Sequence, residues 1–354
     1  MANFVGIPGY NWGDGTGGNV ALSIQERVMR IIRDESIFVF MSLRSPIPGD
    51  DVRAGTVYIR QPMIPQSRPY SVSQVVNEVP QVDSVKIDID SRRTNFYEIE
   101  SFDTSRIIDA DAVLGEIAGG LSSAIMADMS AHYFLMLADY FENDTIGNSR
   151  VIVSSTFGEP TATEAQAKAD SFLLGTTRVN LEKTYSRKYI GVPGSEILSV
   201  IDGYGVLNMV KGTTTGNSGD MALGLIQAGG FAVRELWGTR YVQCNLIGLG
   251  ADVATGQSWA LDYAYDMSNY RAFIIHTEAF AFVINNMQIE SVRNQNNLNI
   301  RYIAKYQFGG GRVRDLAYAI VHAPLTTELK KARKTNSPLF IKNMTYKQPL
   351  SSQK

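Results

Sequence analysis

The feature that most constrains the fold is a run with helical periodicity that extends from Asp109 to Asn143. Apolar side chains recur along it at intervals of three or four residues, from Leu114 to Tyr140, and no proline interrupts them. Asp109 and Asp111 at its start suit the positive end of a helix dipole. At 1.5 Å per residue such a helix is about 50 Å long, which is the width of a small domain. The sequence therefore predicts one long helix over residues 109–143.

Two ordinary explanations compete for this run. A transmembrane helix needs about 20 apolar residues without charge, whereas Glu116, Asp128 and Asp139 are spread through this one. A helix of a helical bundle would fit the length, but most of the chain that follows has strand and turn patterns. The pair Gly119-Gly120 weakens the helix locally and predicts a bend or a close helix contact.

The composition is typical of a soluble globular protein with more than one core. The chain has 354 residues and a formal net charge of −2, so affinity for nucleic acid through phosphate neutralisation is not expected. Its single cysteine, Cys244, cannot form an internal disulfide and is predicted to be a buried thiol in a reducing compartment. The first residues have neither the basic region nor the apolar run of a signal peptide, which favours synthesis in a cytoplasm.

The sequence contains no convincing catalytic, metal-binding or cofactor-binding pattern. Its three histidines, His132, His276 and His322, are far apart and each is interpreted as structural. The run GDGTGG at Gly13–Gly18 lacks the Lys-Ser/Thr of a P-loop. The run GNSGD at 216–220 departs from the nucleophile segment of trypsin-type proteases at the residue before the serine. We therefore expect no enzyme, no resident cofactor and no metal site.

The N-terminal part predicts an arm and a β finger. Residues 1–20 are rich in glycine and asparagine, and a short amphipathic helix is expected at 21–34. Thr56–Arg60 and Val85–Asp90 have strand patterns, and the proline-rich segment between them predicts a stiffened tip without a core of its own. Because an isolated hairpin is marginal in water, the finger needs another surface, such as a neighbouring subunit. The alternative is a disordered loop.

The middle of the chain predicts a connector and then an α/β region. Residues 91–108 are expected to link the finger to the long helix, with Arg92 and Arg93 in surface salt bridges or in ion pairs between subunits. After the long helix we predict a strand at Arg150–Ser155 and then a helix that is capped by Thr163 and ends at Thr184. The apolar side of this helix is predicted to carry Ala165, Ala169, Phe172 and Leu173. The elements predicted further along are a short helix at Glu196–Ile201, strands at Arg240–Leu249 and Tyr270–His276, and a segment of uncertain type at Glu278–Ile284.

The clearest hairpin pattern lies near the C-terminus. Ile300–Phe308 alternates in polarity, Gly309–Gly311 is expected to turn the chain, and Ala317–His322 is expected to return as an apolar strand. The basic cluster at Leu329–Lys334 is interpreted as a solvated surface, with binding to DNA or to the acidic tail of a partner as the alternative.

This C-terminal segment, NLNIRYIAKYQFGGGRVRDLAYAIVHA, combines a strand with basic and aromatic residues, a turn and a closing apolar strand. Together with the order of arm, finger, long helix and glycine-rich α/β region, it resembles the major capsid protein of tailed bacteriophages, the Hong Kong 97 fold. The resemblance implies an α+β fold with a peripheral domain and an α/β axial domain. The implied boundaries are 1–49 for the N-terminal arm, 50–90 for the extended β-hairpin loop, 91–150 for the peripheral domain with its spine helix at 109–143, 151–285 for the axial domain, and 286–354 for the closing β-hairpin of the peripheral domain and the C-terminal tail.

The resemblance also implies a function. The chain would be a structural protein of the virion, assembled in the host cytoplasm as hexamers and pentamers into an icosahedral shell. This shell would enclose double-stranded DNA without sequence-specific binding and without a membrane. Partners would include a portal protein, a decoration protein and a scaffolding protein, which we expect to be separate because only about 35 residues precede the extended loop. We expect a non-covalent shell, because the only lysine near the finger, Lys86, lies away from the tip.

Two other functions remain open from the sequence. An encapsulin-like compartment could use the same fold to hold protein cargo, and a phage tail or baseplate component could also assemble through arms and hairpins. A soluble enzyme is the third alternative. If the chain builds a shell, its functional residues are contact residues between subunits. The candidates are Tyr10 and Trp12 of the arm, Arg53, Arg60, Arg68 and Lys86 of the finger, Arg92 and Arg93 at its base, and Arg301, Lys305, Arg312 and Arg314 of the C-terminal hairpin.

Overall fold

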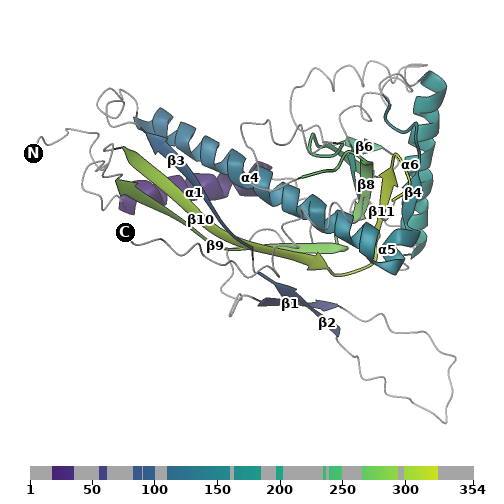
Figure 1. Cartoon of the computed structure of the whole chain (residues 1–354), viewed down its shortest axis with the longest axis horizontal. Helices are drawn as coiled ribbons and strands as arrows, with labels where there is room; N and C mark the ends of the chain where they lie inside the picture. The colour runs from purple at the N-terminus through teal and green to yellow at the C-terminus, as the bar shows by residue number, and fades with distance from the viewer. Residues whose placement is uncertain are drawn as a thin grey trace, which may run out of the picture. The chain divides into compact units, whose positions relative to one another are not determined.

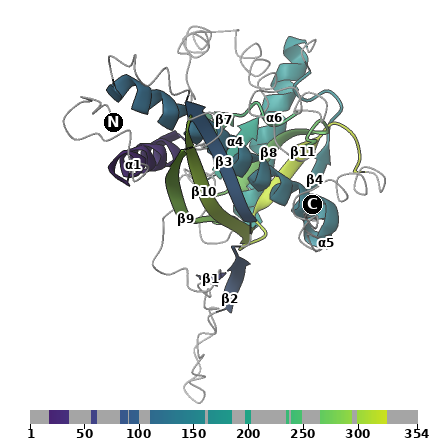
Figure 2. The ribbon, with the colours of Figure 1, turned by 60° about the vertical axis from the view of Figure 1, so that its left-hand side comes forward.

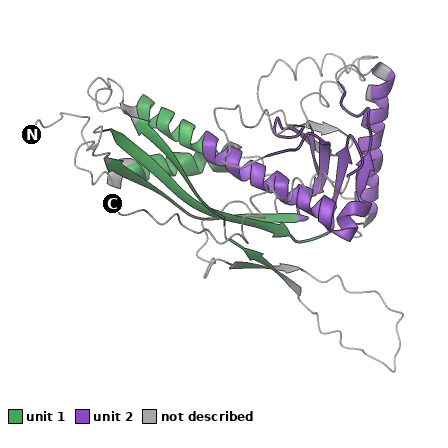
Figure 3. Cartoon of the chain, viewed as in Figure 1, with its two compact units in different colours: residues 1–122, 280–314 green, residues 123–279, 315–354 purple. Residues whose placement is uncertain are grey.

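The computed structural model divides the chain into two compact units (Figure 3). Unit 1 comprises Met1–Ser122 and Phe280–Arg314, and unit 2 comprises Ser123–Ala279 and Asp315–Lys354. The structure describes residues 18–35, 56–61, 83–89, 91–99, 110–159, 163–184, 197–201, 234–236, 239–248, 265–293 and 299–325, and all structural statements concern these residues.

The predicted long helix is confirmed as α4 (Ala110–Asn143), and the division between the units falls inside it. By length and composition alone its segment Ala112–Asn143 could cross a membrane, but core helices of soluble proteins pass the same test. A Cβ on Gly120 would lie 3.1 Å from Cε2 of Tyr97, whereas one on Gly119 would meet nothing within 4 Å. Gly120 therefore lies close to a side chain of the strand Ser91–Ile99 and not to another helix, and Gly119 makes no close contact.

Unit 1 contains the two strands predicted for the base of the finger. β1 (Thr56–Gln61) and β2 (Asp83–Asp88) pair antiparallel, with Thr56 opposite Asp88 and Gln61 opposite Asp83. The predicted tip, residues 62–82, lies outside the described residues. The amphipathic helix predicted before the finger is also confirmed, as α1 (Gly18–Glu35).

The main sheet of unit 1 has three antiparallel strands, with β10 (Ile300–Arg312) between β3 (Ser91–Ile99) and β9 (Phe280–Arg293) (Figures 1 and 2). Residues 91–99, at the start of the predicted connector 91–108, form a strand that pairs along β10 from Ser91 opposite Phe308 to Ile99 opposite Ile300. The segment of uncertain type at Glu278–Ile284 contains the start of β9.

The predicted C-terminal hairpin is also wrong. β10 continues as a strand through Gly309–Gly311, because β9 supplies a hydrogen-bonding edge as far as Arg312 opposite Phe280. The returning strand β11 (Ala317–Val321) belongs instead to the sheet of unit 2. The alternation predicted for β10 is correct, because Tyr302, Ala304, Tyr306 and Phe308 are all buried.

Both helices of unit 1 are attached to this sheet by specific contacts. On α1, Gln25 Nε2 donates to the carbonyl oxygen of Met287 at 2.9 Å, and the backbone N–H of Ile289 donates to Gln25 Oε1 at 3.4 Å. The first half of α4 packs on β3, where the ring of Tyr97 lies against Gly120 and its hydroxyl donates to Glu116 Oε1 at 3.5 Å. One face of the sheet is therefore covered from within unit 1.

Unit 2 is built on a mixed sheet of six strands in the order β4-β11-β8-β5-β7-β6, with parallel pairs β11–β4 and β5–β7. The strands not yet named are β4 (Val151–Val153), β5 (Ile197–Ile201), β6 (Arg234–Leu236), β7 (Thr239–Gln243) and β8 (Tyr270–His276). β8 matches its predicted bounds, while β7 stops at Gln243 and a turn follows. The short helix predicted at Glu196–Ile201 is wrong, because β5 is a strand with every residue buried.

The core of unit 2 contains a cluster of stacked aromatic rings on β8 and the second half of α4. The ring of Phe273 lies 5.9 Å from those of Phe134 and Phe141 and 5.0 Å from that of Tyr270, between ring centroids. The hydroxyl of Tyr270 donates to the buried carboxylate of Glu142 at 3.1 Å. These contacts bury the phenol without leaving its hydroxyl unpaired.

Two helices follow α4. Each begins after a capping residue, and the longer one buries a different side from the side that was predicted. Asp144 caps the short helix α5 (Thr145–Ser149) by accepting from the backbone N–H of Ile146 at 2.8 Å. Helix α6 (Glu164–Thr184) begins after Thr163, as predicted. Its predicted apolar side is wrong, because Phe172 is 72% exposed and the buried residues lie on the opposite side, at Asp170, Leu174, Thr177 and Leu181.

Candidate contact surface

The base of the finger is fixed to the main sheet of its own unit by a small apolar core. The core consists of Val57 on β1, Ile87 and Ile89 on and after β2, Ala281 and Val283 on β9, and Val313 after β10. A Cβ on Gly309 would collide with the carbonyl oxygen of Asp88, so only glycine allows this approach of the two backbones. The base of the finger thus lies on another surface, as predicted, but that surface is the main sheet of its own unit and not a neighbouring subunit.

The other side of the three-stranded sheet, here called the outer face, carries alternate residues of each strand. These residues are Arg92, Thr94, Phe96 and Glu98 on β3, Arg301, Ile303, Lys305 and Gln307 on β10, and Gln288, Glu290 and Val292 on β9. Two large apolar side chains on it are exposed, Phe96 by 65% and Val292 by 46%. A sheet of this kind ordinarily has one core face and one polar face, so the exposed phenylalanine makes the outer face a candidate contact surface.

Charged side chains hold Phe96 in place. The guanidinium carbon of Arg301 lies 4.8 Å from the centroid of the Phe96 ring. The same guanidinium donates from Nη2 to Glu98 Oε2 at 2.7 Å and from Nε to that oxygen at 3.1 Å, while Asn299 donates to Glu98 Oε1 at 3.1 Å. Arg301 thus joins an aromatic ring and a carboxylate on two neighbouring strands, an arrangement that favours a fixed ring orientation.

A second ion pair lies further along the outer face. Lys305 Nζ donates to Glu290 Oε2 at 2.6 Å, and both side chains are about half exposed. Exposed pairs of this kind contribute little to stability, typically about 0–1 kcal/mol. The two ion pairs surround the apolar centre of the outer face with charges of both signs.

The structure brings some of the predicted contact residues together and separates others. Arg92, Arg301 and Lys305 share the outer face, whereas Arg93 alternates to the other side of β3. At the end of β10, Arg312 is exposed and Arg314 is half-buried.

The predicted contact residues of the finger and arm are only partly described. Lys86 is exposed on β2 and pairs with Asp88 at 3.0 Å. Arg60 occupies β1 opposite Ser84. Tyr10, Trp12, Arg53 and Arg68 lie outside the described residues.

Sequence reasoning missed the apolar centre and the acidic partners of this surface. Phe96 and Glu98 were assigned to a connector, because the polar and apolar residues of SRRTNFYEI do not alternate. Val292 lies on the same face of β9 as Glu290, so alternation in polarity does not mark it either. The sequence of 91–99 therefore carries no clear strand signal, and β3 is a strand because β10 lies beside it.

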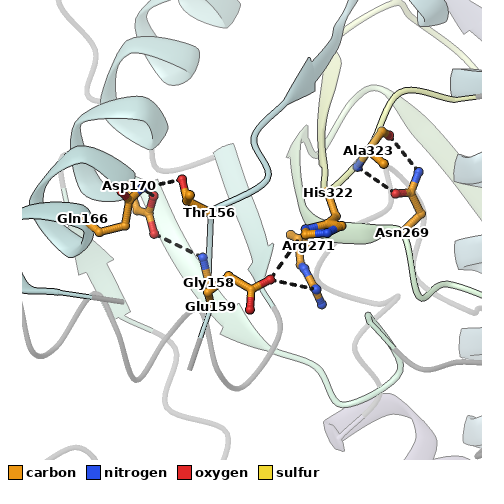
Figure 4. A network of polar contacts seen from close by, with 9 residues as sticks. All are labelled: Thr156, Gly158, Glu159, Gln166, Asp170, Asn269, Arg271, His322 and Ala323. Atoms are coloured by element: carbon orange, nitrogen blue, oxygen red, sulfur yellow. Dashed lines mark hydrogen bonds and ion pairs between the residues drawn. The ribbon is translucent and has the colours of Figure 1, made fainter. Parts of the chain in front are cut away.

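Unit 2 contains a polar network that could be mistaken for a catalytic site (Figure 4). Asp170 accepts from the backbone N–H of Gly158 at 3.1 Å and from Gln166 Nε2 at 3.1 Å. Burial raises the pKa of the Asp170 carboxyl, and these two hydrogen bonds oppose the shift. The bonds attach the turn before α6 to the helix itself, and Gly158 adopts a left-handed backbone with φ of 72° in that turn.

The rest of the network joins strand ends. Glu159 lies 3.4 Å from Arg271 Nη2 and 3.6 Å from His322 Nδ1. Asn269 and Ala323 exchange two hydrogen bonds of 2.9 and 3.0 Å. Each contact links two chain segments, which is typical of a structural network. Across the described residues, no group of three or more His, Cys, Asp or Glu could hold a metal ion.

Comparison with known proteins gives the class of fold. No protein-family model matches the sequence, and no curated protein matches it. Among solved structures, a chain of the capsid of the cyanophage P-SCSP1u is similar with a TM-score of 0.52 and 14% identity, covering 82% of this chain and 88% of that chain.

Two further solved structures extend this comparison. A chain of the mature capsid of bacteriophage PhiM1 gives a TM-score of 0.51 and 14% identity over 81% of this chain and 87% of that chain. A chain of the virus-like particle from Pyrococcus furiosus gives a TM-score of 0.46 and 9% identity over 84% and 98%. The similarities to the P-SCSP1u and PhiM1 capsid chains show that the chain has the fold of phage capsid proteins.

Proposed function

We propose that this chain is the major capsid protein of a tailed bacteriophage and that it has a Hong Kong 97-like fold. In this proposal it assembles as hexamers and pentamers into an icosahedral shell that encloses double-stranded DNA. The observation that carries the proposal is a capsid fold with a charged and apolar sheet face left exposed on a single chain. An enzyme would instead need a pocket with convergent reactive groups, and the polar network of unit 2 serves to join chain segments.

The parts of the fold receive these roles. α4 is the spine helix, the sheet β3-β10-β9 belongs to the peripheral domain, and the six-stranded sheet belongs to the axial domain. The finger is the extended loop, and its base is fixed by the apolar core around Val57 and Ile87. A fixed base gives a neighbouring subunit a defined direction from which to receive the finger, because the two strands cannot pivot without opening that core.

The arginines predicted on the finger test its role in assembly. In the variant Arg60→Glu/Arg68→Glu we expect a folded subunit that does not form shells. The reason is that a surface of the neighbouring subunit that attracts arginine would repel glutamate. The matched control is Arg60→Lys/Arg68→Lys, which keeps the charge and should assemble. Normal particles from the glutamate variant would remove the finger arginines from the interface.

Lys86 supports a non-covalent shell. It lies on β2 and not in the tip segment, and a hydrogen bond with Asp88 and the charge of Asp88 raise its pKa. Ladders of multimers that survive boiling in detergent would contradict this proposal.

The partners are proposed from the same resemblance to phage capsid proteins. A portal protein, a decoration protein and a separate scaffolding protein would act with this chain, and no membrane would be needed. Purified subunit that forms correct closed shells alone would remove the scaffolding protein from the proposal. DNA would be enclosed without sequence-specific contacts, which agrees with a formal net charge of −2.

The experiment that tests the function is electron microscopy of particles made by the chain together with the neighbouring genes of its native source. We expect closed shells that contain DNA. Closed shells filled with protein and free of nucleic acid would favour the encapsulin-like alternative. Tubes or discs would favour a tail or baseplate component, and a dispersed monomer with no particles would overturn the proposal.

A further inference from the structure

Strand β9 of unit 1 lies at the margin of its sheet, and one side chain of helix α1 occupies that margin. In the order β3-β10-β9, β10 pairs with one side of β9, and no strand among the described residues pairs with the other side. β9 has 14 residues, whereas a typical strand has about five or six. A long free edge of this kind is ordinarily open to pairing with another chain.

The side-chain amide of Gln25 fills two hydrogen-bonding positions on this edge. Its Nε2 donates to the carbonyl oxygen of Met287 at 2.9 Å, and its Oε1 accepts from the backbone N–H of Ile289 at 3.4 Å. A backbone residue of a parallel strand makes the same pair of bonds, because it donates to one residue of its neighbour and accepts from the residue two further along. Gln25 therefore takes the place of one residue of an added strand.

The helix that carries Gln25 is held in place by its own apolar side. Ile24, Val28 and Ile32 are fully buried, and α1 packs on β9 within unit 1 (Figure 2). Gln25 follows Ile24 directly, so its side chain leaves the helix beside this apolar side and can reach the strand edge. Because the packing of α1 fixes the amide there, loss of the amide alone should leave the helix in place.

The edge of β9 is also interrupted by a β-bulge next to this point. Between Lys305 and Gln307 the register of the β9–β10 ladder shifts, so that two residues of β9, one of them Met287, lie opposite one residue of β10. A bulge breaks the regular row of donors and acceptors that an added strand needs. Past Gln25 the ladder is regular as far as Arg293. Gln25 therefore lies where the bulge ends and the regular edge begins.

We propose that Gln25 is an edge cap, which keeps β9 from pairing with an extended strand of a second copy of the chain. A second copy is the partner to be excluded, because every copy presents the same edge and a concentrated solution of the chain brings these edges together. This proposal concerns the unassembled chain. It goes beyond the proposed function, because it holds whether or not the chain forms a shell.

The variant Gln25→Met tests the cap, because methionine keeps the length of the side chain and loses the amide. At low concentration the Ile289 amide of this variant should exchange with deuterium about tenfold faster than in the natural chain. At high concentration the variant should associate in sedimentation velocity, and slow exchange at Ile289 should return.

The matched control is Glu26→Met, which places the same side chain at an exposed position of α1. It should behave as the natural chain does. Equal exchange and equal association in the two methionine variants would overturn the proposal.

A proline at Ser291 shows whether association uses this edge. Ser291 follows Ile289 by two residues, so its N–H points to the same margin of the sheet and is not needed by β10. Proline removes a donor that an added strand would use. Gln25→Met/Ser291→Pro should therefore stay monomeric, with thermal unfolding as the check of its fold. A folded double variant that associates as strongly as Gln25→Met would overturn the proposal.

The variant Gln25→Glu makes the cap depend on pH and decides the case in which the double variant does not fold. A carboxylate accepts from Ile289 but cannot donate to Met287, whereas a protonated carboxyl can do both, as the amide does. We expect association at neutral pH and a monomer at about pH 4, with the natural chain monomeric at both values. A Gln25→Glu chain that behaves in the same way at the two pH values would overturn the proposal.

Discussion

The two sheets of this protein bury their side chains in different ways. In unit 2, β5 is buried at every residue and β8 at all but one, so the strands have both faces covered. In unit 1, β3 alternates between exposed and partly buried residues and β10 between buried and partly buried or exposed ones, and the exposed residues include Phe96. Unit 2 completes its core within one chain, whereas the outer face of unit 1 stays largely exposed in the single chain.

This difference separates residues that affect the stability of the fold from residues that are expected to affect association. Residues in the sheet of unit 2 act on the folding of the chain, because their surroundings belong to the same chain. Residues on the outer face have few intramolecular contacts to lose, so their substitution should change association and leave folding nearly intact.

Removal of one aromatic ring from each sheet should give the largest difference in the free energy of unfolding. Phe273→Ala should cost about 3–5 kcal/mol of the free energy of unfolding, because it opens a cavity among three stacked rings. Phe96→Ala should cost less than about 0.5 kcal/mol. Urea unfolding of the unassembled chain measures both values. Equal losses at the two positions would contradict the distinction between the sheets.

The fixed base of the finger gives the next largest effect. Gly309→Ala should destabilise unit 1 by about 2 kcal/mol, because the backbone at Asp88 cannot move away from a new methyl group without disturbing the core around Ile87. Gly115→Ala on α4 is the control, since a Cβ there meets nothing within 4 Å, and it should stabilise by about 0.5–1 kcal/mol. A neutral Gly309→Ala would show that the finger is loosely attached.

The ion pairs of the outer face should have smaller effects on folding. Glu98→Ala removes the acceptor of a two-pronged bond from Arg301 and should cost about 0.5–1 kcal/mol, while Glu290→Ala should cost less because its partner Lys305 is more exposed. Thermal unfolding of the two variants measures the difference. A cost above about 2 kcal/mol for either variant would mean that the outer face contributes substantially to the core of unit 1.

The smallest effect concerns the pH dependence of unit 2. Because burial raises the pKa of Asp170, the folded chain holds that proton to a higher pH than the unfolded chain does. The contribution of this group to stability is therefore greatest below the ordinary Asp value near 4 and decreases as pH rises through the raised value. Subtracting the curve of Asp170→Asn from that of the natural chain should isolate this slope, and a slope of opposite sign would contradict the assigned cause.

Local patterns predicted the elements whose determinants are local. The long helix, both strands at the base of the finger, the cap at Thr163 and the strand β8 all follow from spacing, proline placement or capping residues within one segment. These signals do not depend on what the segment packs against.

The missed features depend on contacts between distant segments. Gly309–Gly311 continue β10 because β9 and the backbone near Asp88 lie alongside, and no residue near the glycines indicates this. β5 was taken for a helix because a strand with both faces buried lacks alternation. The face of α6 was misassigned because the helix is apolar on two sides, and sequence alone does not show which one unit 2 covers.

Only the basic residues of the candidate contact surface were predicted from the sequence. Arg92, Arg301 and Lys305 were singled out by their charge, but Glu98 and the ring of Phe96 lie on a strand that pairs with β10 across about 200 residues of sequence. The contact roles of Tyr10, Trp12, Arg53 and Arg68 stay predictions, because these residues lie outside the described part of the chain.

The most direct test of the account is cryo-electron microscopy of assembled particles from the natural chain and two variants at Phe96. We predict closed shells in which density from a neighbouring subunit covers the outer face, with Phe96→Leu assembling and Phe96→Glu remaining as folded, unassembled subunits. Shells in which Phe96 is fully exposed to solvent, or normal shells from Phe96→Glu, would contradict the claim that this face exists for contact between subunits.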